Sequence, residues 1–251
     1  MIGWKKIGNI CAGKTTLSKQ LGELYGSKVF YEPATKNPFL EKFYKEPKKY
    51  AFRLQIWLLK YRYKTYNEAL MFMKKEKKGI ILDRSIFSDY VFAKQVLLDG
   101  FITKEQFETY LDLREKMMGS VPLPDHIVYL NVSVDECHQR IHNIRKRKEE
   151  IATGIPKSYL AGLENCYHEL IEQMHEKGIN VVKLDWNYFG KAEKIVDLLQ
   201  PPHLNPNNQS DLSEQIMKWE FNLSTFLELQ RFSVNSEWDN DYKDLEIIQL
   251  N

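Results

Sequence analysis

The residues from Gly8 to Thr15 read G-N-I-C-A-G-K-T and fit the phosphate-loop pattern G-x-x-x-x-G-K-[ST]. Glycines at both ends let consecutive backbone N–H groups turn toward a phosphate, Lys14 adds a positive charge, and the Thr15 hydroxyl is placed to bind Mg²⁺. Leu17, Leu21 and Leu24 follow at helical spacing and predict a helix. The loop would then lie at the N-terminus of this helix, where the helix dipole also attracts anions. A glycine-rich turn between a strand and a helix is the alternative. The predicted phosphate-binding residues are Gly8, Asn9, Ile10, Cys11, Ala12, Gly13, Lys14, Thr15 and Thr16.

Charged residues follow two short apolar segments, at the strand ends where α/β proteins keep their chemistry. Glu32 follows the segment 28–31, and a carboxylate there is suited to accept a hydroxyl proton. A surface acid before proline is the alternative. Asp83 and Arg84 follow the segment 79–82, where an arginine can bind phosphate in a bidentate manner and the aspartate can orient it or hold a metal. An internal ion pair explains these two residues equally well.

Two further groups of residues can contact the ligands of such a site. Arg145 and Arg147 lie in a charged run before a break at 154–156, and cations on a mobile segment can close over a transferring phosphate. A solvated helix face is the alternative. Gln55 and Arg62 share one helix face with aromatic neighbours and can read a nucleobase, although a packed aromatic core is the commoner explanation.

The elements that must position these residues alternate along the chain. Strands are predicted at 28–31, 79–82, 126–130 and 180–184, and helices at 47–77, 90–98, 104–118, 134–150, 157–175 and 192–199. This alternation predicts an α/β fold with a parallel sheet covered by helices on both faces. Lys5 and Lys6 suit a buried first strand poorly. Either this strand is short and frayed, or the N-terminus has diverged from that of a working enzyme, or the start is misassigned.

Composition predicts one sizeable globular domain with an appendage. The 251 residues are 43% hydrophobic and 28% charged, which argues against wholesale disorder. Three cysteines, Cys11, Cys137 and Cys166, have no metal-ligand spacing, which favours a reducing compartment. No stretch approaches the roughly 18 apolar residues of a membrane span, and neither a secretory signal nor an Arg-rich presequence is recognisable.

Charge is distributed unevenly between the two parts of the chain. Residues 201–251 carry three basic and nine acidic residues, a net charge of −6, against +2 for the whole chain. The remaining basic excess on residues 1–200 suits an anionic ligand, and a solvated surface excess gives the same balance. The composition of 201–208 predicts a linker. The large apolar residues beyond it predict an acidic C-terminal extension, 201–251, that docks on the domain at 1–200 or on a partner.

The order of these motifs resembles the deoxynucleoside kinase family over residues 8 to about 200. The matching stretches are G-N-I-C-A-G-K-T-T, Y-E-P, R-L-Q-I-W-L-L-K-Y-R, D-R-S-I-F-S-D, and R-K-R-K-E-E before G-I-P-x-x-Y-L. The resemblance implies a P-loop kinase fold that transfers the ATP γ-phosphate to a deoxynucleoside 5′-hydroxyl. It implies Glu32 as general base, assisted by Asp83 and Arg84, with Lys14 and Thr15 holding the ATP phosphates and Mg²⁺. The other implied contacts are Gln55, Arg62 and Asp89 to the nucleobase, Tyr44 and Glu150 to the sugar 3′-hydroxyl, and Arg145 and Arg147 in a lid.

A second branch of the superfamily resembles the chain more closely. The nucleoside-kinase-like accessory subunit of mitochondrial NADH:ubiquinone oxidoreductase, complex I, is similar in G-N-I-C-x-G-K, R-L-Q-x-W-L and R-S-I-F-S-D-x-V-F, and it also carries a C-terminal extension. Lys5, Lys6 and Lys146 depart from a working kinase. We therefore expect a non-redox complex I subunit at the membrane-arm periphery, on the matrix side of the mitochondrial inner membrane. It would bind ATP or another purine nucleotide, with Mg²⁺ if a triphosphate is bound, and would need no turnover. The alternative is an active, cytoplasmic deoxynucleoside kinase; neither hypothesis involves nucleic acid or a transmembrane segment.

Overall fold

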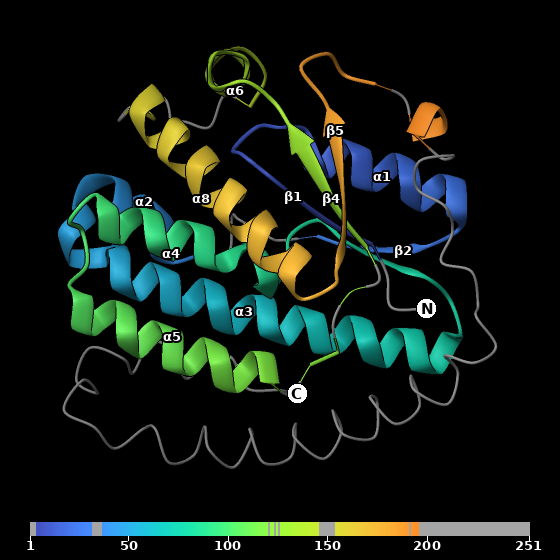
Figure 1. Ribbon diagram of the computed structural model, residues 1–251, viewed down its shortest axis with the longest axis horizontal. Helices are drawn as coiled ribbons and strands as arrows, with labels where there is room; N and C mark the ends of the chain where they lie inside the picture. Colours follow the sequence, from blue (N-terminus) through green and yellow to red (C-terminus); the bar gives the residue numbers. More distant parts are fainter. Residues whose placement is uncertain are drawn as a thin grey trace.

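In the computed structural model of the chain, five parallel strands form one sheet (Figure 1). The structure describes residues 4–31, 37–119, 121–122, 124, 126–145, 154–190 and 192–195. The strands are β1 (Trp4–Gly8), β2 (Lys28–Phe30), β3 (Ile80–Leu82), β4 (His126–Asn131) and β5 (Asn180–Asp185). Their order across the sheet is β2-β3-β1-β4-β5. The predicted α/β class with a parallel sheet is confirmed.

Helices connect these strands in the described part of the chain. They are α1 (Lys14–Tyr25), α2 (Leu40–Lys45), α3 (Pro47–Glu76), η2 (Ile86–Ser88), α4 (Asp89–Leu98), α5 (Lys104–Gly119), α6 (Val134–Arg140), η3 (Ile141–Arg145), α8 (Lys157–Glu176) and η4 (Ala192–Ile195). Figure 1 shows α3, α4, α5 and α8 grouped in one layer, while α1 lies apart from them. Within the described residues no helix is long and apolar enough to cross a membrane.

Both faces of the sheet are covered by packed side chains. In β4 the four residues Ile127, Val128, Tyr129 and Leu130 are each at most 1% exposed. Successive residues of a strand point to opposite faces, so burial of all four requires cover on both sides. Helix α1 contacts β1, β2 and β3, whereas α8 contacts β5. The predicted two-sided covering is confirmed.

The middle strand, β1, contains the two lysines that had argued against it. It pairs with β3 on one side and β4 on the other, and Lys5 and Lys6 are 1% and 0% exposed. The Lys5 Nζ lies 3.7 Å from the ring centroid of Tyr66 and 3.8 Å from that of Phe87, so aromatic faces stabilise its charge. On the opposite face, burial lowers the pKa of Lys6 to about 7. The hypothesis of a short, frayed first strand is therefore wrong.

Two helix predictions also need correction. The helix predicted over 134–150 ends as an α-helix at Arg140, and a π-helical turn follows over Ile141–Arg145. At its start, Ser133 Oγ accepts a hydrogen bond from the backbone N–H of Glu136, which caps α6. Leu24, predicted on the apolar face of the first helix, is 44% exposed, because the buried stripe of α1 ends near Leu21. The predicted linker and the acidic extension, 201–251, lie outside the described residues.

Candidate active site

The phosphate loop joins β1 to α1 at the carboxyl edge of the sheet. Gly8 and Gly13 have φ angles of 145° and 95°, and Cys11 has a φ of 60°. A Cβ atom at position 8 would lie 2.9 Å from the carbonyl oxygen of Leu130. Any residue other than glycine at this position would therefore clash with β4. The backbone therefore follows the tight path that a phosphate-binding loop requires.

Lys14 lies inside this loop. Its Nζ donates to the carbonyl oxygen of Gly8 at 2.8 Å and to that of Asn9 at 2.7 Å, and the residue is 6% exposed. Burial, together with the neighbouring charge of Arg84, lowers the pKa of Lys14 to about 7. A phosphate beside the ammonium group would oppose both effects, since a nearby negative charge favours the protonated form.

Thr15 and Asp83 form a pair of oxygen donors beside the loop. The Thr15 Oγ1 donates to the Asp83 Oδ2 at 2.7 Å. Asp83 follows β3, which neighbours β1, so the strand order brings the two residues together. The other carboxylate oxygen, Oδ1, is buried and has no hydrogen-bond partner among the described residues. A hydroxyl and a carboxylate suit Mg²⁺, which takes one or two protein ligands together with phosphate oxygens; these residues therefore fit that ion.

The loop and its neighbours line a cavity of about 270 Å³. The lining residues are Cys11, Ala12, Gly13, Lys14, Thr15, Thr16, Asp83, Arg84, Arg140, Ile144, Arg145 and Phe189. Three arginines and one lysine against a single carboxylate make this cavity cationic, which suits a polyphosphate. Sequence reasoning had predicted Arg84 and Arg145 for this site, but it missed Arg140, Ile144 and Phe189.

The π-helical turn brings two arginines to the loop. One Nη of Arg140 donates to the carbonyl oxygen of Ala12 at 3.4 Å, and one Nη of Arg145 donates to the Cys11 Sγ at 3.9 Å. Residues five apart on an α-helix point about 140° away from each other. In a π-helix the i→i+5 hydrogen bond places such residues roughly one turn apart, on the same side. The turn over 141–145 therefore directs both side chains toward the phosphate loop.

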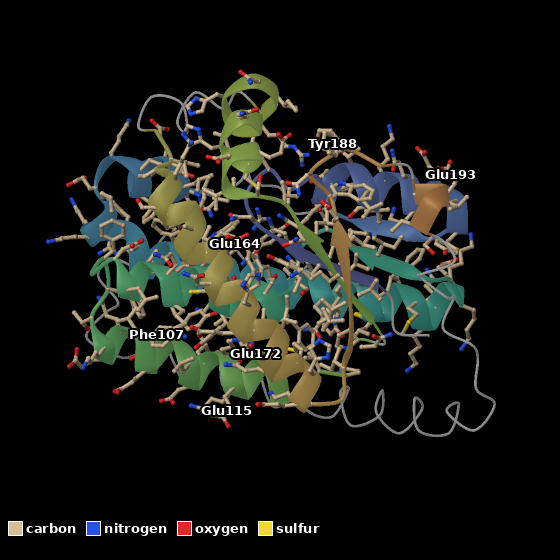
Figure 2. All side chains as sticks on the ribbon, turned by 45° about the horizontal axis from the view of Figure 1, so that its top comes forward. Phe107, Glu115, Glu164, Glu172, Tyr188 and Glu193 are labelled. Atoms are coloured by element: carbon tan, nitrogen blue, oxygen red, sulfur yellow. The ribbon has the colours of Figure 1, made fainter. Side chains whose placement is uncertain are left out.

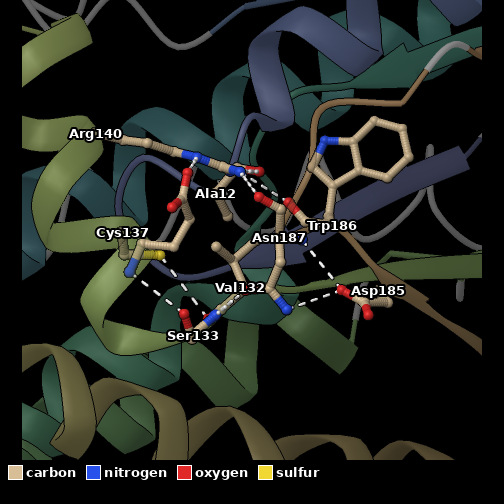
Figure 3. A network of polar contacts seen from close by, with 9 residues as sticks. Ala12, Val132, Ser133, Cys137, Arg140, Asp185, Trp186 and Asn187 are labelled. Atoms are coloured by element: carbon tan, nitrogen blue, oxygen red, sulfur yellow. Dashed lines mark hydrogen bonds and ion pairs between the residues drawn. The ribbon is translucent and has the colours of Figure 1, made fainter.

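Arg140 also ties the loop after β5 to the site (Figure 3). Its Nε donates to the Glu136 carboxylate at 2.7 Å, and its other Nη donates to the carbonyl oxygens of Trp186 and Asn187 at 2.9 and 2.7 Å. The Phe189 ring centroid lies 4.1 Å from the Arg140 Cζ. The guanidinium group is thus held between α6, the phosphate loop and the segment after β5.

Phe189, on the segment after β5, completes the rim of the cavity. Phe189 is 51% exposed, and a Cβ atom at Gly13 would lie 2.9 Å from its Cε1 atom. Its neighbour Tyr188 is 90% exposed and lies on the loop that follows β5 (Figure 2). The only sequence signal for Phe189 was its position just beyond a strand end, since no motif marks the segment D-W-N-Y-F.

A second cluster lies next to Arg84. Arg62 on α3 forms a buried ion pair with Asp89, the first residue of α4, and the two side chains are 4% and 0% exposed. The guanidinium carbons of Arg62 and Arg84 lie 5.7 and 5.2 Å from the ring centroid of Phe92. Because Arg84 also lines the cavity, Phe92 connects the phosphate side of the site to the buried ion pair.

Gln55 and Tyr110 extend this second cluster. Gln55 precedes Arg62 by two helical turns, so both lie on one face of α3. It is 2% exposed, and its Oε1 has no hydrogen-bond partner among the described residues. A buried acceptor of this kind favours a ligand that donates a hydrogen bond. The Tyr110 hydroxyl donates to the Asp89 Oδ2 at 2.7 Å, a contact that sequence reasoning missed.

The remaining predicted residues divide into two groups. Tyr44 is partly buried between the two apolar clusters of the core. Burial raises the pKa of Tyr159. The neighbouring Tyr44 acts in the same direction, and the charge of Arg84 opposes it. Glu32, Arg147 and Glu150 lie outside the described residues, so their roles as base, lid cation and sugar contact stay predictions.

The fold and the loop define a P-loop kinase of the α/β class. A family model described as deoxynucleoside kinase matches residues 7–201. The chain therefore belongs to the deoxynucleoside kinase family, as its motifs predicted.

Individual relatives represent both branches that the motifs indicated. A deoxyguanosine kinase of Dictyostelium discoideum is 46% identical over 190 residues, covering 76% of this chain and 66% of the relative. The mitochondrial NADH dehydrogenase [ubiquinone] 1 alpha subcomplex subunit 10 of Bos taurus is 32% identical over 212 residues, covering 76% of this chain and 61% of the relative. The chain thus spans about two thirds of these relatives or slightly less. A structure of deoxyadenosine kinase from M. mycoides with bound dATP superposes with a TM-score of 0.69 at 28% identity, covering 80% of this chain and all of that one.

Proposed function

We propose that the chain is a deoxynucleoside kinase that transfers the γ-phosphoryl group of ATP to the 5′-hydroxyl of a deoxynucleoside. We further propose that 6-oxopurine deoxynucleosides are its preferred acceptors. The observation that supports this best is the cationic cavity, in which the phosphate loop, the Thr15–Asp83 pair and Arg84 lie together. The 46% identity to a deoxyguanosine kinase supports the same activity.

The residues around the cavity match the needs of phosphoryl transfer. The loop N–H groups and Lys14 bind the ATP phosphates, while Arg84 and Arg145 offset the charge that develops on the transferring oxygens. Thr15 and Asp83 would hold Mg²⁺, which would neutralise part of the phosphate charge. Glu32, which comes two residues after the end of β2 in the sequence, is the proposed base that accepts the proton of the 5′-hydroxyl.

The cluster of Arg62 and Asp89 supports a preference for a purine base with an oxo group at C6. An arginine can donate two parallel hydrogen bonds to O6 and N7 of guanine. Arg62 shares the ring of Phe92 with Arg84, which lines the cavity, and its guanidinium is paired with Asp89. Both carboxylate oxygens of Asp89 accept hydrogen bonds, from Arg62 and Tyr110, so this carboxylate already serves to orient the arginine. The donor set therefore favours guanine or hypoxanthine over adenine.

The exposed rim supports ATP as the phosphate donor. Phe189 presents a half-exposed ring beside the loop, with Arg140 on one of its faces. Such a surface suits stacking of a purine ring whose phosphates enter the loop.

The kinase proposal is tested by initial rates with MgATP and each of the four deoxynucleosides. We expect deoxyguanosine to give the highest kcat/KM. Glu32→Gln should lower the rate by a factor on the order of 10²–10⁴, the usual contribution of a general base. Glu23→Gln, which neutralises an exposed carboxylate on α1, serves as the control and should leave the rate unchanged. Failure of the folded wild-type protein to phosphorylate any of the four would reject the proposal.

A second candidate function is that of an accessory subunit of mitochondrial complex I. It is favoured by the 32% identity to the Bos taurus subunit. In that role the cavity would hold a purine nucleotide without turnover, on the matrix side of the inner membrane. The motifs alone favoured this candidate. We propose the kinase first, because the identity to a kinase is higher and because four cationic residues line the cavity.

Native electrophoresis of the endogenous protein separates the two candidates. Comigration with NADH dehydrogenase activity would support the subunit, and migration as a small free species would reject it. Removal of residues 203–251 should then weaken incorporation into the complex. Nucleotide binding should be retained, because every predicted phosphate and sugar contact lies before Gly154.

A further inference from the structure

We propose that Tyr110 is a positioning residue that fixes base recognition by holding the carboxylate of Asp89. The inference rests on the proposed function, because it assigns the cluster of Arg62 and Asp89 to the deoxynucleoside base. Tyr110 belongs to α5, carries no predicted role, and donates its hydroxyl to the Asp89 Oδ2 at 2.7 Å.

The hydroxyl of Tyr110 is a permanent donor in this position. The residue is 0% exposed, and burial raises the pKa of its hydroxyl well above the ordinary value, with the Asp89 charge acting in the same direction. Its ring stacks on Phe107 of the same helix at a centroid distance of 6.1 Å and an interplanar angle of 12°. Packing therefore fixes the ring and with it the position of the hydroxyl oxygen beside Asp89.

Two helices hold the Asp89 carboxylate from different sides. Arg62 on α3 donates to Oδ1, while Tyr110 on α5 donates to Oδ2. An ionised carboxylate only accepts hydrogen bonds, and the N-terminus of α4, where Asp89 lies, favours its negative charge. Because these two donors act on different oxygens, rotation of the carboxylate about its own axis would break both bonds.

The fixed carboxylate in turn orients the guanidinium of Arg62. Side chains that act in binding are most effective when neighbouring hydrogen bonds set their orientation. Without the Tyr110 hydroxyl, the carboxylate could turn, the Arg62 donors would lose their alignment with an oxo base, and one Asp89 oxygen could accept from an amino base. Tyr110 thus determines selectivity without a need to contact the base.

The test compares wild type with Tyr110→Phe, which keeps the ring and removes only the hydroxyl. We expect the KM for deoxyguanosine to rise about tenfold, the effect of one hydrogen bond to a charged group. We expect kcat to change less than twofold and the KM for ATP to stay constant. The ratio of kcat/KM for deoxyguanosine to that for deoxyadenosine should fall about tenfold.

Tyr66→Phe is the matched control. Tyr66 is also 0% exposed, and its hydroxyl donates at the same 2.7 Å, but to the carbonyl oxygen of Pro122. Both variants lose a buried phenol hydrogen bond, so both should melt at a lower temperature, while only Tyr110→Phe should change base selectivity. Unchanged selectivity in Tyr110→Phe, or equal changes in the two variants, would overturn the inference.

The role of Tyr110 can be tested even if the protein has no kinase activity. If the wild-type protein turns over no deoxynucleoside, the kinase proposal fails, and calorimetric titration with deoxyguanosine then decides the role of Tyr110. About tenfold weaker binding in Tyr110→Phe, with normal binding in Tyr66→Phe, would support the inference. Equal binding in all three proteins, or no binding by wild type, would overturn it.

Discussion

The hydroxyl of Thr15 donates to the carboxylate of Asp83, with 2.7 Å between Oγ1 and Oδ2. The bond links the start of α1 to the end of β3, two positions that are 68 residues apart. The second carboxylate oxygen of Asp83, Oδ1, is buried and has no hydrogen-bond partner among the described residues. This oxygen is therefore available as a ligand for a cation that binds together with a polyphosphate. We therefore propose that these two side chains make nucleotide binding dependent on Mg²⁺.

Replacement of Thr15 tests this pair. Thr15→Val keeps the shape of the side chain but removes the hydroxyl, so Mg²⁺ should no longer strengthen ADP binding. Thr15→Ser keeps the hydroxyl and should behave like wild type. Titration calorimetry with and without EDTA measures the difference, which we expect to be about 10- to 100-fold in Kd for wild type and less than threefold for Thr15→Val, given several kcal/mol for metal stabilisation of phosphate charge. Equal dependence on Mg²⁺ in both proteins would contradict this assignment.

Lys14 makes nucleotide binding dependent on pH. Its pKa of about 7 in the free protein means that the ammonium loses its proton as pH rises through 7, whereas a bound phosphate favours the protonated form. Binding above pH 7 must therefore take up a proton, and the Kd for ADP should rise with pH by up to about tenfold per unit. Calorimetry at pH 8 in two buffers of different ionisation enthalpy measures the uptake.

Two variants of Lys14 serve as controls for that titration. Lys14→Ala should lose retention of a purine nucleotide, and Lys14→Arg should bind with a smaller pH dependence because arginine stays charged. Lys6 titrates in the same range in every one of these proteins, so its contribution cancels. A pH dependence that is identical in wild type and Lys14→Arg would show that another group is responsible.

The buried Lys6 should destabilise the fold most at low pH. Below pH 7 it is charged in both native and unfolded states, and the native state bears the cost of a buried charge. Between pH 7 and 10.5 only the unfolded state holds the proton, so wild-type stability from this group rises with pH. Lys6→Met should therefore raise Tm by several degrees at pH 6 and by less at pH 9. Calorimetric melting at the two pH values checks this, and a lower Tm at both would mean that Lys6 is stabilised by a partner.

The π-helical turn predicts the effect of a one-residue deletion. Removal of Asn143 should convert residues 141–145 to regular α-helix, in which Arg140 and Arg145 lie four residues apart, about 40° around the helix axis. Both side chains would still point to the phosphate loop, so the affinity for ATP should stay near that of wild type, whereas Arg145→Ala should weaken it. Asn143→Ala, which keeps the chain length, should also bind like wild type. An ATP affinity after the deletion as low as that of Arg145→Ala would contradict this account of the turn.

Local sequence patterns predicted those site residues that belong to a short motif or directly follow a strand. The glycine–lysine–threonine loop and the Asp83–Arg84 pair are marked by a motif and by a strand end, and parallel strand order then places them together. Arg140 and Tyr110 were missed because their contacts join segments 128 and 21 residues apart, and a regular α-helix would have directed Arg140 and Arg145 to different sides. Lys5 misled the strand prediction because hydrophobic patterning takes no account of the two aromatic rings that surround its ammonium group.

The most direct test of the central claim is the product of a reaction with purified protein, MgATP and deoxyguanosine, followed by ³¹P NMR. We predict that the γ-phosphate signal of ATP disappears while ADP and deoxyguanosine 5′-monophosphate appear in equal amounts, and that Lys14→Ala gives neither product. ATP that stays intact, or ADP accompanied only by inorganic phosphate, would contradict the assignment of this chain as a deoxynucleoside kinase.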